Sequence, residues 1–396
     1  MPTPRNLLPP SAAELDHVAA VEDSIRRRIV DSGGLIPFSE FMEMALYAPG
    51  LGYYNTGTWK LGAGGDFTTA PELGGLFAAC VARQCEQVLK ELGEADILEF
   101  GAGSGALCVD LLSRLQQSGI LPRRYLILET SADLRRRQQQ CVQSLDETVA
   151  DRIVWLDDLE ELEFNGVVIA NEVLDAMPVE RFTVTESGYE RHMVGLESSG
   201  FLVKAVTPER SDTAILDIIH DYTLQPGYTS EYNARAGAFV KTVAALMQRG
   251  VVILIDYGYS GAEYYHAERT TGTLRCHYRH RAHNDPLTNA GIQDITAHVD
   301  FSAAAQAGLH AGLVLLGFTN QASFLVNCGL MEIAGSSRLE PEAQMRLANE
   351  IKYLTLPSEM GEAFKVLALG KSYDIPLCGF SRYDRRQSLC VENNRD

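Results

Sequence analysis

The chain has 396 residues, of which 46% are hydrophobic, and it carries a formal net charge of −18 with a pI near 5.0. This length is ample for a large core and favours two or three structural units. A protein that grips nucleic acid needs clustered Lys and Arg, so the acidic balance argues against a nucleic-acid partner. It is compatible with a basic peptide or protein partner.

The eight cysteines form no CxxC pair, so neither a zinc site nor any other metal site is expected. Disulfide frameworks are typical of small secreted domains, which favours reduced thiols here. No apolar run approaches the roughly 18 residues that a bilayer crossing needs. Residues 1–10 lack both the apolar region of a secretory signal and an Arg-rich presequence. We therefore expect a cytoplasmic protein without membrane insertion, with the mitochondrial matrix as second choice.

The first part of the chain is predicted to be helical over about residues 11–48. Ser11 and Glu14 have the spacing of a capping box, and the apolar residues of 38–47 suit a short amphipathic helix after Pro37. Residues 49–71 are rich in Gly and Tyr and show no period, which predicts a loop. Long ordered loops in compact domains are usually functional.

From residue 96 onward, short apolar strands alternate with helical stretches such as 106–117 and 132–143. This alternation predicts an α/β fold with a mostly parallel sheet that helices cover on both faces. Two insertions interrupt it: a β-hairpin unit over 179–206 followed by helices, one at about 232–248, and a polar segment over 262–299. The strands are expected at 97–100, 124–129, 152–155, 166–171, 251–256, 312–318 and 364–369, with a further helix near 341–354.

A glycine-rich turn follows the first of these strands. Glu99 precedes Gly101, Gly103 and Gly105, and glycines at such a turn let the backbone approach a ligand closely. A dinucleotide would need the pattern GxGxxG, whose last position is here Ala106. S-adenosylmethionine carries no phosphate, and the acid at Glu99 suits its positively charged amino acid end. The turn therefore favours S-adenosylmethionine over NAD.

Acidic residues also follow the second and third strands. Glu129 can accept both hydroxyls of a ribose, as it would with either cofactor. We expect at least one of Asp157 and Asp158 to meet the adenine amino group; the alternative is two exposed loop acids.

The segment after the fourth strand carries Asn171, Glu172 and Asp175. Parallel sheets place reaction centres at the carboxyl ends of their strands, so these residues are expected to face the transferred methyl group. A guanidinium nucleophile needs carboxylates that orient it and take up its proton. The alternative is a helix N-terminus decorated with capping residues.

His298 and Asp300 lie just before an apolar helix. Asp300 is expected to cap that helix, and His298 is a candidate catalytic residue, although a lone His is more often structural. Arg275 and His277 begin a polar cluster that we interpret as a solvated or substrate-contacting loop.

Together these segments resemble the MidA-like family of S-adenosylmethionine-dependent methyltransferases, whose mitochondrial branch is associated with respiratory complex I assembly and protein arginine methylation. The resemblance covers about residues 33–369. Besides the glycine-rich turn, it is carried by residues 47–54 (YAPGLGYY), 65–72 (GDFTTAPE), 171–178 (NEVLDAMP) and 296–301 (TAHVDF).

The resemblance implies a seven-stranded class I methyltransferase fold, Rossmann-like and doubly wound, with residues 65–72 over the cofactor. Phe67 would cover the ligand, and Thr68 or Thr69 would bond its carboxylate. Thr69, Pro71 and Glu72 would also open the next helix. The expected division is an N-terminal helical region with the covering loop (1–75), a cofactor-binding core (76–178 and 250–396) and an inserted substrate subdomain (179–249).

The function expected from these features is methylation of a protein substrate, with arginine as the favoured acceptor. Methylation of a small molecule and a SAM-binding assembly factor with little activity are the alternatives. An NAD-dependent oxidoreductase is disfavoured by the turn and by the lack of a Tyr-x-x-x-Lys pair next to a strand. The oligomeric state is left open, with a dimer as one option.

Overall fold

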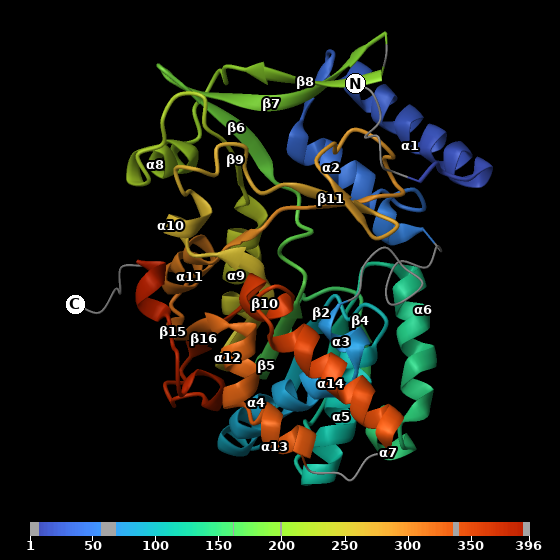
Figure 1. Cartoon of the computed structure of the whole chain (residues 1–396), viewed down its shortest axis with the longest axis vertical. Helices are drawn as coiled ribbons and strands as arrows, with labels where there is room; N and C mark the ends of the chain where they lie inside the picture. Colours follow the sequence, from blue (N-terminus) through green and yellow to red (C-terminus); the bar gives the residue numbers. More distant parts are fainter. Residues whose placement is uncertain (1–7, 57–68, 161, 199, 336–339, 391–396) are drawn as a thin grey trace.

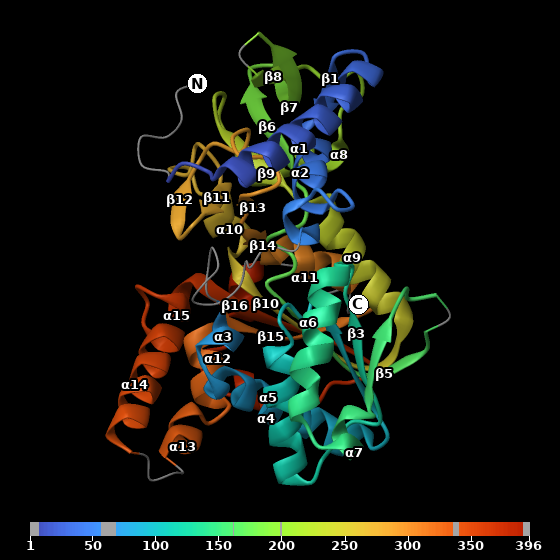
Figure 2. The same cartoon turned by 90° about the vertical axis from the view of Figure 1, so that its right-hand side faces the viewer.

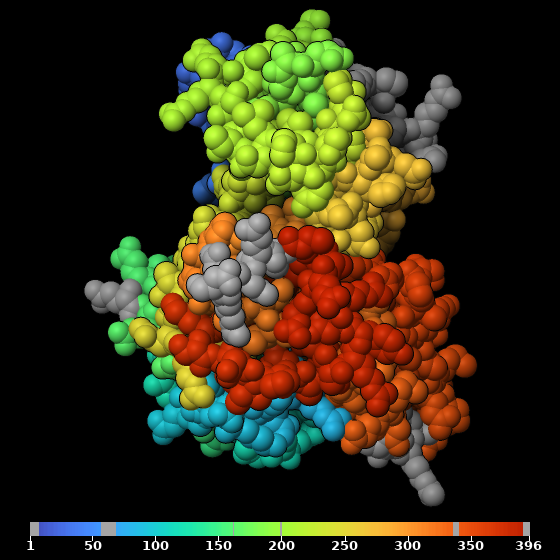
Figure 3. All heavy atoms as spheres, turned by 90° about the vertical axis from the view of Figure 1, so that its left-hand side faces the viewer, coloured from blue at the N-terminus to red at the C-terminus, as the bar shows by residue number. Residues whose placement is uncertain are grey.

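The computed structural model describes residues 8–56, 69–160, 162–198, 200–335 and 340–390. Two parts are stacked along the long axis of the molecule: a lower core around a large sheet, and an upper part that we call the cap (Figures 1 and 2). The chain enters the cap first, descends into the core, and returns to the cap twice. Figure 3 shows the first return in yellow-green above the red C-terminal segments of the core.

The core sheet has the order β15-β16-β10-β5-β2-β3-β4, with the short β14 (Val299–Asp300) paired to the end of β10. β16 is antiparallel to both of its neighbours, whereas the pairs from β10 to β4 are parallel. The expected doubly wound, mostly parallel sheet is thereby confirmed. The strands are β2 (Asp96–Phe100), β3 (Tyr125–Leu128), β4 (Ile153–Leu156), β5 (Phe164–Asn171), β10 (Met247–Tyr259), β15 (Val314–Asn320) and β16 (Phe364–Lys371).

Successive side chains of these strands point to opposite faces, and both faces are covered by helices. Ile97, Val167 and Ile253 pack on one side with α4 (Gly75–Leu92) and α5 (Ala106–Ser118). Leu98 and Val168 pack on the other with α9 (Ala234–Leu246) and α11 (Phe301–His310). Because both faces are buried, the strands read as continuous apolar runs in the sequence.

The cap contains α1 (Ala12–Asp31), α2 (Phe38–Tyr47), a five-stranded antiparallel sheet and a three-stranded sheet ordered β12-β11-β13. Val21, Phe38, Val194 and Ile295 belong to one hydrophobic cluster, so the N-terminal helices and both insertions share a core. The expected division placed the N-terminal helices (1–75) and the first insertion (179–249) in separate units, whereas here they share one core. It also placed α9 in the insertion, but α9 packs on the core sheet. The cap strands are β1 (Leu35–Pro37), β6 (Glu180–Thr185), β7 (Gly188–Glu197), β8 (Gly200–Val206), β9 (Thr229–Tyr232), β11 (Arg275–Tyr278), β12 (Arg281–His283) and β13 (Asp294–Thr296).

The remaining helices complete both parts, and none of the helices in the described ranges is long and apolar enough to cross a membrane. Ser11 and Glu14 form the expected capping box at the start of α1. The other helices are α3 (Ala70–Leu73), α6 (Ala132–Cys141), α7 (Glu147–Ala150), α8 (Thr213–Asp221), α10 (Gly261–Tyr264), α12 (Gln321–Asn327), α13 (Leu330–Gly335), α14 (Pro341–Thr355) and α15 (Met360–Ala363), with a 3-10 turn η1 (Tyr53–Asn55).

Candidate functional site

A cavity of about 710 Å³ lies between the carboxyl edge of the core sheet and the cap. Its walls come from the ends of β2, β3, β5 and β10, from α2 and η1, and from β11 and β13. Ligand sites are expected at this edge of a doubly wound sheet, and the volume lies within the range of about 300–1,000 Å³ typical of small-molecule pockets.

The glycine-rich turn joins β2 to α5 at one end of the cavity. Gly101, Gly103 and Gly105 have φ of 62°, 54° and 90°, a region that favours glycine. Gly101 and Gly103 line the cavity. Glu99 is 2% exposed and accepts the hydroxyl hydrogen of Tyr125 at 2.7 Å. Burial raises the pKa of Glu99 to about 7, although the Tyr125 hydrogen bond opposes this.

A network around Gln138 of α6 fixes the second carboxylate, Glu129. Gln138 Nε2 donates to Glu129 Oε2 and to the carbonyl oxygen of Gly103, each at 3.0 Å. Its Oε1 accepts the indole N–H of Trp155 at 3.0 Å. Glu129 also accepts the backbone N–H of Ser131 at 2.9 Å. One buried amide therefore braces both the turn and the β3 carboxylate, a role that the sequence analysis missed because Gln138 resembles any polar helix residue.

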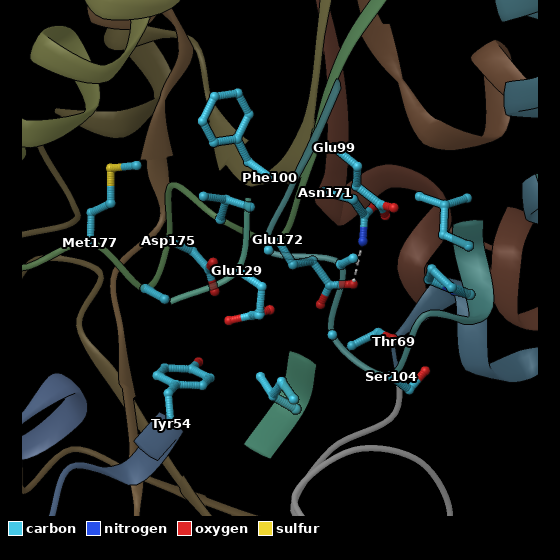
Figure 4. A pocket seen from close by; sticks show the side chains of 18 of the residues that line it. Tyr54, Thr69, Glu99, Phe100, Ser104, Glu129, Asn171, Glu172, Asp175 and Met177 are labelled. Carbon is cyan, nitrogen blue, oxygen red and sulfur yellow. Dashed lines mark hydrogen bonds between the residues drawn. The ribbon is translucent and has the colours of Figure 1, made fainter. Parts of the chain in front are cut away.

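Asn171 at the end of β5 lines the same cavity, as do Glu172 and Asp175 of the loop that follows. Figure 4 shows the side chains of Glu129, Glu172 and Asp175 directed toward this space, with Tyr54 beside it. Asn171 Nδ2 donates to Glu172 Oε1 at 3.2 Å. Glu172 has a φ of 54°, a left-handed conformation that is uncommon for glutamate and often marks functional sites.

The electrostatics of this loop are those of crowded, poorly hydrated carboxylates. Withdrawal from water and the charge of Asp175 raise the pKa of Glu172 to about 8, against a hydrogen bond from Asn171. Burial raises the pKa of Asp175 to about 6, opposed by a hydrogen bond from Tyr257. Two buried oxygens, Asp175 Oδ1 and Asn171 Oδ1, have no hydrogen-bond partner among the described residues. Two carboxylates with raised pKa values therefore line the cavity from this loop.

The cap contributes aromatic and polar side chains to the cavity. Tyr47 and Tyr54 stack with ring centroids 5.4 Å apart, and the Tyr47 hydroxyl donates to the carbonyl oxygen of Ala176 at 2.9 Å. Arg275, His277 and Asp294 also line the cavity. Residues 47–54 carried the family resemblance without an assigned role, and Asp294 was not among the expected site residues.

His298 lies in the wall, stacked on Tyr259 at 5.2 Å and edge-on to Tyr257 at 5.0 Å. Burial lowers its pKa to about 4, so the imidazole is neutral at pH 7. Asp300 caps α11 by accepting the backbone N–H groups of Ser302 and Ala303, as expected.

Several expected cofactor residues lie elsewhere. Asp157 is 84% exposed and paired with Arg135, and Asp158 accepts the backbone N–H of Glu160. Neither lines the cavity, so the described geometry gives no support to the expectation that one of them meets the adenine amino group. Gly105 does not line the cavity either. It packs against α6, where a Cβ at this position would come within 3.2 Å of Gln138 Cα.

The covering segment is described only in part, because Phe67 and Thr68 lie outside the described residues. Thr69, Pro71 and Glu72 line the cavity, and Glu72 hydrogen-bonds to Ser104 of the glycine-rich turn. Thr69 stands at the start of α3 without a side-chain capping bond, and Pro71 occupies the first turn of that helix.

Comparison with known proteins gives three concordant findings. A model of the family described as "Putative S-adenosyl-L-methionine-dependent methyltransferase" matches residues 80–319. A crystal structure from Burkholderia thailandensis, described as a "likely methyl transferase" bound to S-adenosyl-homocysteine, is 42% identical with a TM-score of 0.92, covering 97% of this chain and 100% of its own. The protein arginine methyltransferase NDUFAF7, mitochondrial, of Danio rerio is 29% identical over 89% of this chain and 90% of its own length.

The location expected from the sequence is contradicted by these relatives. The Danio rerio protein and the Drosophila melanogaster homologue, which is 28% identical over 91% of this chain and 86% of its own length, are both named as mitochondrial. The expectation of a cytoplasmic protein rested on the lack of a recognisable targeting signal, and that absence was a weak basis.

Proposed function

The chain belongs to the family of S-adenosyl-L-methionine-dependent methyltransferases, and from this premise we propose that it methylates an arginine side chain of a protein substrate. The observation that carries the proposal is the pair of carboxylates Glu172 and Asp175, which line one cavity and whose pKa values are raised to about 8 and about 6. Two carboxylates crowded together away from water favour a ligand that brings positive charge and N–H groups. A guanidinium brings five.

The residues at the other end of the cavity fit S-adenosylmethionine. The carboxylate of Glu129 at the end of β3 suits two ribose hydroxyls, and Glu99 with Gly101 and Gly103 suits the amino acid end. When bound, the cofactor supplies an electrophilic methyl group on its sulfonium centre.

The protein residues then have three tasks toward the acceptor. Glu172 and Asp175 would bind the guanidinium and orient one nitrogen toward the methyl group. Methylation of that nitrogen releases a proton, which Glu172 would accept, since its pKa of about 8 makes it a stronger base than His298 with a pKa of about 4. Tyr257 and His298 would form an apolar wall that excludes water.

Two further observations support a protein acceptor. The net charge of −18 favours a basic partner. The relatives from Danio rerio and Drosophila melanogaster are named protein arginine methyltransferases. A small-molecule acceptor remains the alternative outcome of the experiment that follows.

Calorimetric titration with S-adenosylmethionine, with NAD as control, tests the cofactor half. Wild-type protein should bind S-adenosylmethionine and not NAD, and Gly103→Val should lose binding because a side chain at a φ of 54° would distort the turn. Transfer of radioactive methyl groups into lysate proteins, followed by mass spectrometry, tests the acceptor. Methylarginine formed by wild type and not by Glu172→Gln is the expected result; label found only in small molecules would contradict the proposal.

A further inference from the structure

The cap places a carboxylate of its own opposite the loop after β5. Asp294 of β13 is 3% exposed and lines the cavity. Its Oδ1 accepts the hydroxyl hydrogen of Tyr54 at 2.9 Å. His277 of β11 is its cross-strand partner and lines the cavity as well. Asp294 is therefore held in a defined position by groups of the cap, facing the same space as Glu172 and Asp175.

We propose that Asp294, positioned by Tyr54, is a third acceptor-binding carboxylate that makes the site selective for a guanidinium over an ammonium group. This inference rests on the proposed function. Glu172 and Asp175 come from the core, whereas Asp294 comes from the second insertion of the cap. The acceptor group is thus bound between the two parts of the molecule.

Electrostatic coupling across the cavity agrees with this geometry. The negative charge of Asp294 contributes to the raised pKa of Glu172, after burial and the charge of Asp175. It likewise contributes to the raised pKa of Tyr257, after burial and the charges of Asp175 and Asp256. Carboxylates from two parts of the fold thus repel one another across one cavity, and a cation bound between them relieves that repulsion.

The shape of the cation decides the selectivity. A guanidinium is planar and delocalised, and it presents N–H donors along several edges at once. It can therefore meet carboxylates on both sides of a cavity. An ammonium group is a compact point charge with three donors, and it is less suited than a guanidinium to meeting the core and cap carboxylates together. Removing Asp294 should thus weaken arginine binding more than lysine binding.

Tyr54 holds Asp294 and also contacts the cofactor side of the cavity. Its carbonyl oxygen accepts the hydroxyl hydrogen of Ser131 at 2.7 Å, two residues from Glu129. Its ring stacks on Tyr47, whose hydroxyl donates to Ala176 next to Asp175. Tyr54 is therefore a positioning residue, and Tyr54→Phe removes only the hydrogen bond to Asp294 while it keeps the stacked ring.

The test measures binding of the peptides Gly-Gly-Arg-Gly-Gly and Gly-Gly-Lys-Gly-Gly to protein saturated with S-adenosyl-homocysteine. Wild type should prefer the Arg peptide. Asp294→Asn should weaken Arg-peptide binding about 10-fold or more, as expected for loss of a charge-assisted hydrogen bond, and should reduce the preference over Lys. Tyr54→Phe should produce a smaller loss of the same kind. S-adenosyl-homocysteine affinity should change less than about twofold in both, which also shows that they fold.

Asp23→Asn is the matched control, because it makes the same chemical change away from the cavity. Asp23 lies on α1 of the cap, and its side chain is 68% exposed. It should bind both peptides like wild type. Equal Arg-peptide affinity for wild type and Asp294→Asn would overturn this inference and leave the proposed function standing. A wild-type protein that binds S-adenosyl-homocysteine but shows no preference for the Arg peptide would overturn both.

Discussion

The side chain of Asp256, at the carboxyl end of β10, accepts the backbone N–H of Asp175 at 3.2 Å. Asp256 Oδ2, which accepts the Asp175 N–H, also accepts the N–H of Leu174 at 3.0 Å, and Asp256 Oδ1 accepts the N–H of Tyr257 at 2.9 Å. Asp256 is fully buried and does not line the cavity. The loop that carries the proposed acceptor-binding residues is thus held from behind by the neighbouring strand.

Asp256→Ala should therefore impair catalysis without impairing cofactor binding. The change leaves the N–H groups of Leu174 and Asp175 unpaired in the interior, which costs about 1–3 kcal/mol of stability. The freed loop should lower kcat by about 10- to 100-fold, since small misplacements of reacting groups have effects of this size. S-adenosyl-homocysteine affinity, measured by calorimetry, should stay within about twofold of wild type. A matching loss of cofactor affinity would show that Asp256 supports the fold generally and not this loop.

Methyl transfer should become faster as pH rises toward 8. Glu172 must be ionised to bind the guanidinium, and its pKa is raised to about 8 by burial and by Asp175, whose own pKa is about 6. The value of kcat/KM reports the free enzyme, so it should rise about tenfold per pH unit from pH 6 to 8 and level off above. Below pH 6 the rise should be steeper, because Asp175 then loses its charge as well.

The Asp175→Asn variant offers the internal check on that profile. Asp175 contributes to the raised pKa of Glu172, so its neutralisation should move the remaining inflection to lower pH. Initial rates measured at saturating S-adenosylmethionine between about pH 5.5 and 9 give the profiles of wild type and variant, because this range spans the two pKa values. A flat wild-type profile between pH 6 and 8 would remove Glu172 from the proposed role.

Glu172→Gln should stabilise the protein while it abolishes activity. The folded-state pKa of about 8 lies above the usual 4.5, so folding favours the protonated form and stability falls as pH rises between these values. The amide removes that loss and keeps the same backbone conformation. The free energies of unfolding of wild type and variant should coincide near pH 4 and differ by pH 8 in favour of the variant, by on the order of 1 kcal/mol after allowance for solvent screening. A variant less stable than wild type at pH 8 would contradict the raised pKa.

The core sheet could be predicted from the sequence because its central parallel strands β2, β5 and β10 are almost entirely buried. β5 and β10 therefore appear as uninterrupted apolar runs, and their carboxyl ends locate the glycine-rich turn and the Asn171–Asp175 loop. The cap was harder to predict. β11 contains Arg275 and His277 in only four residues, so neither its apolar content nor its period marks it as a strand.

The contacts that complete the candidate site have no local signal. Tyr54 and Asp294 are 240 positions apart, and only the fold brings them together. The left-handed backbone of Glu172 is equally unpredictable, because glutamate is not a residue that favours a positive φ. Asp157 comes directly after β4, a position where a cofactor-binding residue is expected. Its side chain is instead exposed and paired with Arg135 of α6.

Gln138 should control cofactor affinity although it does not line the cavity. Its amide hydrogen-bonds to the Gly103 carbonyl, to Glu129 and to Trp155, so Gln138→Leu leaves three polar groups unsatisfied and frees the Glu129 carboxylate. Calorimetry should show S-adenosylmethionine binding weakened by about 10-fold or more, because a ligand-binding carboxylate loses the hydrogen bond that orients it. Gln139→Leu makes the same change at the next position of α6, where the side chain is exposed, and should bind like wild type. Unchanged affinity in Gln138→Leu would mean that Glu129 is held well enough by Ser131 alone.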